Sequence, residues 1–143
     1  MTKFSFLPAG IIIALFILIA SCEKQEIPPP LEASKLVLEP DITAYSGIPG
    51  GVINLKIKIE GEEGFNSVQL RKSEGERLIE EELLLPKKEG KYEAPHELEF
   101  EYVIKNSDPD KFTLTFLVET VNQLSSGGIL TSTNQKTLEV TVD

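Results

Sequence analysis

Apolar and polar side chains alternate with a period of two over much of the chain after Lys35. In the range Ile53–Glu60, aliphatic residues alternate with Asn, Lys and Glu. Successive side chains of a β-strand point to opposite faces of a sheet, so this pattern predicts a strand with one buried and one solvated face. The same pattern, or a weaker form of it, predicts further strands at 35–38, 65–72, 98–104, 112–118 and 137–142.

Short segments rich in glycine, proline, asparagine or aspartate separate these strands, as is typical of turns. They are the segments 47–51, 61–64, 73–76 and 106–110. With the segment 77–85 included, the sequence predicts about seven strands and no long amphipathic helix. Strands of this kind bury their apolar faces when two sheets pack face to face, so we expect an all-β, antiparallel β-sandwich.

Three segments are open to more than one interpretation. The Glu80–Glu82 and Leu83–Leu85 runs suit a helical turn nearly as well as a strand. The segments 86–95 and 121–135 are expected to be long loops, and binding sites are often found on such loops. With seven strands running up and down in turn, both loops would share one end of the domain with loop 61–64. The Ser-, Gly- and Thr-rich residues 123–135 are equally compatible with a flexible loop that binds nothing.

The first residues of the chain have the features of an export signal. Lys3 gives one positive charge, Phe4–Ser21 carries none, and Ile11–Ala20 is strongly apolar. A basic start, an apolar region and small residues before a cleavage point predict a secretory signal peptide. The uncharged stretch also falls within the roughly 17–25 residues that can span a bilayer, so an uncleaved anchor is the alternative, together with ordinary secretion.

The end of this stretch resembles the lipobox of bacterial lipoproteins: Ile19, Ala20 and Ser21 precede Cys22, the only cysteine. The resemblance implies that Cys22 receives a diacylglycerol, that cleavage occurs before it and that the new amino terminus is acylated. It implies a signal peptide at 1–21, a lipidated cysteine with a linker at 22–34, and a folded domain at 35–143.

The linker contains three consecutive prolines, Pro28–Pro30, which favour an extended spacer between membrane and domain. Glu23 and Glu26 follow the cysteine closely, and this resembles the export signal of Bacteroidota surface lipoproteins. The resemblance implies an outer-membrane location, with the domain exposed on the cell surface as a further expectation.

The net charge and the rarity of reactive side chains narrow the function. The formal net charge is −9 at pH 7, which opposes binding to nucleic acid. His96 is the only histidine, so a zinc site or a Cys/His dyad is not expected. The segment 106–110 mimics the start of a calcium loop, but Lys111 and Leu117 replace the glycine and glutamate that such a loop requires, which favours an ordinary turn. We expect no catalytic residue, metal or cofactor.

From Lys35 to Asp143 the strand pattern resembles the immunoglobulin-like modules of bacterial surface lipoproteins. The segments 112–120 and 137–142 are similar to the last two strands of such modules. The chain has no tryptophan and a single cysteine, so the hallmarks of antibody domains are missing. The resemblance implies an immunoglobulin-like β-sandwich over 35–143.

These observations predict a non-catalytic, lipid-anchored binding or assembly module of the cell envelope that contacts a protein partner. The alternative is a carbohydrate-binding accessory lipoprotein of an outer-membrane nutrient-uptake system. Candidate ligand-binding residues are Tyr45 and Tyr92, which lie in or near predicted loops, and Asn122 and Gln123, which begin the longest one. A tyrosine ring could stack on a sugar.

Overall fold

The computed structural model describes residues 32–143. The predicted signal peptide, the lipobox, Cys22 and most of the linker lie outside this range. Within it, no helix is long and apolar enough to cross a membrane. The strands are β1 (Lys35–Glu39), β2 (Ala44–Gly47), β3 (Val52–Glu60), β4 (Ser67–Glu74), β5 (Arg77–Leu85), β6 (His96–Val103), β7 (Lys111–Gln123) and β8 (Ile129–Val142).

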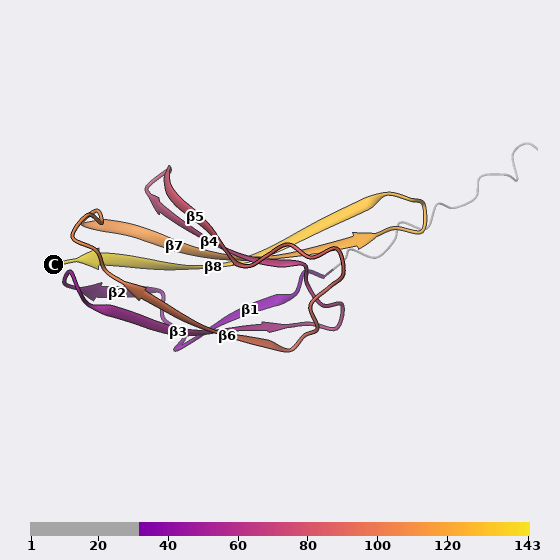
Figure 1. The fold of residues 1–143 in the computed structure, drawn as a ribbon, viewed down its shortest axis with the longest axis horizontal. Coiled ribbons are helices and arrows are strands. Elements are labelled where there is room, and N and C mark those ends of the chain that lie inside the picture. Colours follow the sequence, from indigo (N-terminus) through magenta and orange to yellow (C-terminus); the bar gives the residue numbers. More distant parts are fainter. Residues whose placement is uncertain (1–31) are drawn as a thin grey trace, which may run out of the picture. The chain divides into compact units, whose positions relative to one another are not determined.

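The strands form two sheets that lie in two layers (Figure 1). One sheet has three strands in the order β1-β3-β6, and the other has five in the order β2-β8-β7-β4-β5. All neighbouring strands are antiparallel except β2 and β8, which are parallel. The all-β prediction is confirmed, but the described residues contain eight strands rather than about seven.

The additional strand is β2, which the sequence analysis did not predict. After β1 the chain reaches Pro40, which cannot donate a main-chain hydrogen bond and so interrupts the ladder with β3. The chain then passes to the other sheet, where Ala44–Gly47 pairs with β8. Its side chains are only half-buried or exposed. Main-chain pairing with β8 holds this edge strand, so it does not need a buried apolar face. Its sequence therefore has no alternation of apolar and polar residues from which a strand could be predicted.

The apolar faces of the two sheets enclose one core. Almost every side chain that the alternation predicts to point inward is buried; Leu98 and Val142 are partly buried against the core instead. Phe65 is also fully buried, although it precedes β4. Phe100 of β6 meets Phe116 of β7 edge-on with 5.0 Å between ring centroids, so aromatic contacts connect the two layers.

The segment 77–85 is a strand, which settles the choice left open by its sequence. β5 pairs with β4 and forms an edge of the five-stranded sheet. The pairing has irregularities between Val68 and Gln69 and between Lys72 and Ser73. Each one adds a residue to β5 and reverses the face to which the following side chains point. For this reason the strand shows no regular alternation in the sequence.

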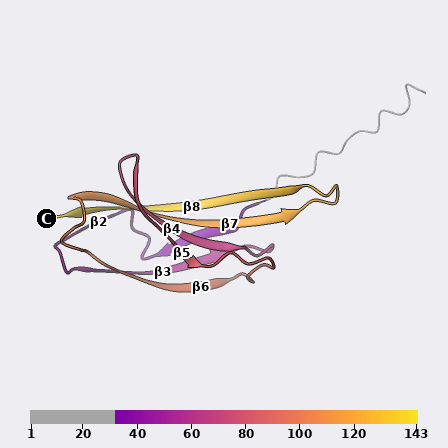
Figure 2. The same ribbon diagram turned by 45° about the horizontal axis from the view of Figure 1, so that its top comes forward.

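The prediction of a long loop at 121–135 is wrong. β7 continues to Gln123, β8 begins at Ile129, and a tight turn joins them, with Gly127 at a φ of +85°. Figures 1 and 2 show this hairpin extending beyond the other strands. In the part that projects past the apolar core most side chains are half-buried or exposed, and the two that remain buried, Thr120 and Asn122, are polar, so the apolar alternation is absent. Threonine residues, which favour extended backbone, take the place of the apolar pattern.

Candidate functional site

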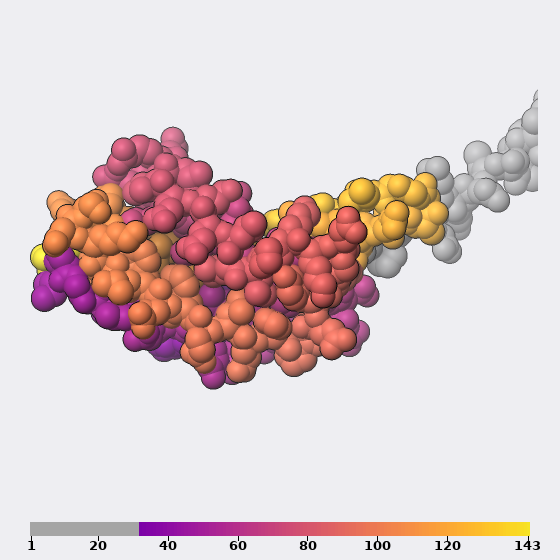
Figure 3. Space-filling view, in the orientation of Figure 1, coloured from indigo at the N-terminus to yellow at the C-terminus, as the bar shows by residue number. Residues whose placement is uncertain are grey.

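A groove opens along the side of the domain where β5 and β6 form the sheet edges. Its volume is about 300 Å³, near the lower limit of roughly 300–1,000 Å³ for ligand pockets. Leu70, Phe100 and Tyr102 line it with apolar surface, and Glu80 and Glu82 contribute carboxylates. Figure 3 looks onto this side of the molecule, with the β4–β5 hairpin above β6.

The carboxylates of β5 reach the groove because of the strand register. Glu82 lies opposite Leu70, and Glu80 lies opposite Lys72. Directly opposite residues share a face of the sheet, so both glutamates point to the side on which β4 buries its side chains. Within residues 32–143 the three-stranded sheet ends at β6, and no strand covers these two side chains. The groove is therefore the uncovered part of the inner face of β5.

The opposite wall of the groove is the free edge of β6. At the end of its ladder with β3, the Ile104 amide donates to the Gly51 carbonyl, and the Ile104 carbonyl accepts from the Gly50 amide. Bonding alternates along an antiparallel pair, so Glu99, Glu101 and Val103 direct their N–H and C=O groups away from β3. These main-chain groups face the open side of the domain.

A buried ion pair lies at the base of the groove. Lys72 donates to Asp108, and their side chains are only 5% and 1% exposed. Tyr102 donates from its hydroxyl to the other Asp108 oxygen at 2.7 Å, and the Lys72 ammonium lies 5.3 Å from the Tyr102 ring centroid. The charge of Lys72 is thus compensated by a carboxylate and an aromatic face.

The pKa values of this cluster follow from burial and hydrogen bonding. Burial alone would raise the pKa of the Asp108 carboxyl, but hydrogen bonds from Lys72, the Lys105 amide and Tyr102 outweigh it and hold the pKa below its usual value. Burial, followed by the hydrogen bond to Asp108, raises the pKa of the Tyr102 hydroxyl. The carboxyl therefore stays ionised and the hydroxyl stays protonated near neutral pH.

Asp108 has a structural role in the segment that mimics a calcium loop. The Lys105 amide donates to its carboxylate at 2.9 Å, and the Asp108 amide donates to the Lys105 carbonyl at 3.1 Å. The second bond closes a β-turn from Lys105 to Asp108, so the segment forms an ordinary turn, as the sequence favoured. Both carboxylate oxygens already accept hydrogen bonds from the protein. Among residues 32–143 no group of three His, Cys, Asp or Glu side chains is placed to hold a metal ion.

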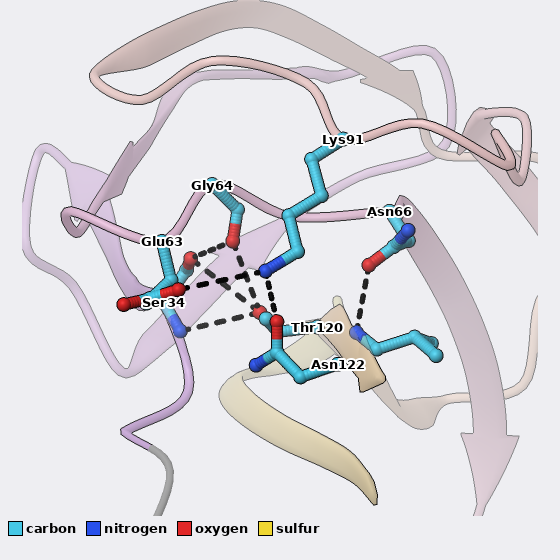
Figure 4. Close-up of polar contacts among 8 residues, drawn as sticks. Ser34, Glu63, Gly64, Asn66, Lys91, Thr120 and Asn122 are labelled. Atoms are coloured by element: carbon cyan, nitrogen blue, oxygen red, sulfur yellow. Dashed lines mark hydrogen bonds and ion pairs between the residues drawn. The ribbon is translucent and has the colours of Figure 1, made fainter. Parts of the chain in front are cut away.

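A second polar cluster lies where the described chain begins (Figure 4). The Ser34 hydroxyl donates to the Gly64 carbonyl at 2.9 Å, and Thr120, which is fully buried, lies within hydrogen-bond distance of both residues. Nearby, the Val121 amide donates to the Asn66 side chain at 2.7 Å. These contacts fasten the segment before β1 to loop 61–64 and to β7. The arrangement is a structural clamp.

The four candidate residues do not form one site. Lys91 donates to Asn122 and pairs with Glu63 at 3.8 Å, whereas Gln123 is exposed at the end of β7. Tyr45 lies on β2, and its hydroxyl is 3.4 Å from the Val52 carbonyl, at the start of β3. Ser34 and its clamp lie beyond the far end of β3, where Glu60 pairs with Lys35. The length of β3 therefore separates Tyr45 from the other candidates.

Tyr92 and His96 belong to an aromatic cluster around Phe65. The Tyr92 ring stacks on Phe65 with 5.2 Å between centroids, and its hydroxyl donates to the Pro86 carbonyl at 3.0 Å. The His96 ring meets Phe65 edge-on at 5.6 Å. Both side chains pack against the fold, and neither presents an arrangement typical of catalysis or sugar stacking. Sequence reasoning did not find the β5–β6 groove, because its residues come from three separate segments.

Comparison with family models, with curated proteins and with solved structures finds no match to the chain.

Proposed function

We propose that this chain is a non-catalytic, lipid-anchored module of the bacterial cell envelope that binds a protein partner. The observation that carries the proposal is the β5–β6 groove, an apolar hollow bounded by two free strand edges. β5 also exposes Leu78 and Leu83, by 54% and 51%. Exposed apolar surface beside open strand edges is typical of protein-interaction sites.

We further propose that the domain is an immunoglobulin-like sandwich. In such sandwiches one sheet contains the strands A, B, E and D, and the other contains G, F and C. By chain order, β1, β3 and β6 correspond to A, B and E, while β8, β7 and β4 correspond to G, F and C. β5 extends the second sheet. No strand in the described range takes the place of D, and that place is the β5–β6 groove.

Lipid anchoring rests on the lipobox residues that end at Cys22. The clamp around Ser34 supports a tethered domain, because it holds the segment that leads back to the linker at one end of the fold. Outer-membrane location, with the domain on the cell surface, follows from the resemblance of Glu23 and Glu26 to a surface-export signal.

The alternative role in carbohydrate uptake has less support. Phe65 covers a face of the Tyr92 ring, and Tyr45 lies on a different strand away from it. A sugar platform would need at least one aromatic face open to solvent within a shared site.

Fractionation of cells that express the wild type or Cys22→Ala tests the anchoring. We expect the wild type in the outer-membrane fraction and degraded when intact cells are treated with protease, and the variant lost from the membrane. The partner is sought by co-purification of the membrane-bound wild type after cross-linking. Equal membrane retention of Cys22→Ala would contradict the lipid anchor, and absence of any cross-linked protein would contradict the binding role.

A further inference from the structure

We infer that the partner contributes an extended segment that pairs with β6, fills the β5–β6 groove and carries Lys or Arg at alternate positions. This inference rests on the proposed function, since it specifies the chemistry of the protein partner at that site.

The main chain of β6 provides the first part of the argument. Its outer N–H and C=O groups, at Glu99, Glu101 and Val103, have no strand beside them in the described structure. An added strand would satisfy these groups, as in other cases of recognition by strand addition. It would become the fourth strand of the three-stranded sheet and would cover the inner face of β5.

The shape of the groove sets the requirement for side chains. In an added strand, alternate side chains point into the domain. They would lie over the apolar surface of Leu70, Phe100 and Tyr102 and would end beside Glu80 and Glu82 on β5. A Lys or Arg side chain meets both requirements, because its aliphatic part packs on apolar surface while its charged end reaches a carboxylate.

The charges around the groove favour a basic segment. Lys72 is compensated by Asp108, and Lys105 pairs with Glu80 at 3.8 Å. No ion pair within residues 32–143 includes Glu82, which points into the groove, so the groove retains one uncompensated negative charge. An acidic segment would bring like charges together, and a purely apolar one would bury this carboxylate without a partner.

The same charges argue against a second copy of this chain as the occupant. β5 carries Glu80–Glu82, and the outer face of β6 carries Glu97, Glu99 and Glu101. Pairing these edges between two copies would place rows of glutamates side by side. Charged side chains on an edge strand are a common means of preventing such self-association.

Binding of three synthetic twelve-residue peptides tests the inference. The peptides alternate Lys with Thr, Glu with Thr, or Gln with Thr, and affinity for the full-length protein in a neutral detergent is measured at about 0.15 M salt, where surface charges are well screened. We expect the Lys–Thr peptide to bind at least tenfold more tightly than the other two. The double variant Glu80→Lys/Glu82→Lys should abolish this preference, while Glu89→Lys/Glu93→Lys, which changes net charge equally in the 86–95 segment, should retain it.

Glu101→Pro is the second test, since it removes an N–H group on the free edge and leaves the ladder with β3 intact. Its matched control is Glu101→Gln, and circular dichroism confirms that both fold. We expect loss of Lys–Thr binding in the proline variant only. Equal binding of the three peptides, an unchanged preference in the Glu80→Lys/Glu82→Lys variant, or a dimer of the chain in sedimentation would overturn the inference. The binding role itself is decided separately, by the cross-linking experiment above.

Discussion

The two edges of the five-stranded sheet differ in length, composition and cover. β2 has four residues, lies between Pro40 and Pro49, and has no large apolar side chain fully exposed. β5 has nine residues, and all but the last two are exposed, including Leu78, Ile79 and Leu83. Short strands flanked by proline are a common way to close a sheet edge. Only the β2 edge is closed in this way.

The comparison indicates that the β5 edge is kept open and is protected by charge. A long apolar edge risks aggregation unless charged residues interrupt it. Glu80–Glu82 provide that interruption at the centre of β5, and Arg71 pairs with Glu81 at 2.8 Å on the outer face. If the partner has the chemistry inferred above, the same glutamates that oppose self-pairing would also select it.

The largest expected change in stability comes from the ion pair beneath the open side. Asp108→Ala leaves the Lys72 ammonium buried without its partner, and breaking a buried pair in this way costs about 3–5 kcal/mol. Urea denaturation measures the free energy of unfolding. Asp110→Ala, in the same turn but exposed, is the control and should change it by less than about 0.5 kcal/mol. Equal effects of the two variants would contradict the role of the pair.

The ion pair also predicts a dependence on pH. The folded-state pKa of Asp108 is lowered, so its contribution to stability is complete above the unfolded-state pKa and is lost as pH falls through the folded-state value. The wild type should therefore exceed Asp108→Asn by the largest margin at neutral pH. That margin should shrink below about pH 3.9, the ordinary pKa of aspartate. A margin that is constant from pH 7 to pH 2, measured by urea denaturation, would contradict this assignment.

A smaller loss of stability is expected when a side chain is added at Gly47, on the β2 edge. A Cβ at Gly47 on β2 would lie 2.8 Å from Tyr45 Cε1 and 3.0 Å from Ile104 Cδ1. Gly47→Ala should cost about 1 kcal/mol, at the lower end for overpacking, because the half-buried Tyr45 ring can shift. Gly90→Ala is the control, since nothing lies within 4 Å of its Cβ position. A stabilised Gly47→Ala variant would show that the β2 edge is looser than described.

The smallest change in stability is expected on the open edge itself. Leu83 is 51% exposed and lies on the outer face opposite Gln69. Leu83→Lys should therefore alter the free energy of unfolding by less than about 0.5 kcal/mol in urea denaturation. A loss of several kcal/mol would mean that the β5 edge contributes to the core, and the contrast with β2 would no longer hold.

The sequence predicted those strands in which apolar and polar residues alternate because one face of the strand is buried. Ile53–Glu60 and Phe112–Val118 are strands because each has one face in the core. β2 was missed because main-chain pairing with β8 holds it. The outer part of the β7–β8 hairpin was missed because its buried side chains are polar and its apolar ones are at least partly exposed. For β2 the information lies in pairing between distant segments, whereas the hairpin pairs two segments that a tight turn joins.

The candidate site was not predictable for the same reason as β2. The groove depends on two features of the sheets. The three-stranded sheet ends at β6, and two irregularities in the β4–β5 pairing decide to which face Glu80 and Glu82 point. The pairing of Lys72 with Asp108 joins residues 36 positions apart, without a local motif. Tyr45 and Tyr92 were selected as tyrosines near loops, but β3 separates them. Residue type alone could not distinguish a packed ring from a binding surface.

Amide hydrogen exchange with and without the Lys–Thr peptide tests the central claim most directly. Strand addition at β6 should slow exchange at the amides of Glu99, Glu101 and Val103, which face the groove, and leave β2 unchanged. Protection at β2 or at the β7–β8 turn, with β6 unaffected, would contradict strand addition at β6, because the peptide would then bind outside the open edge.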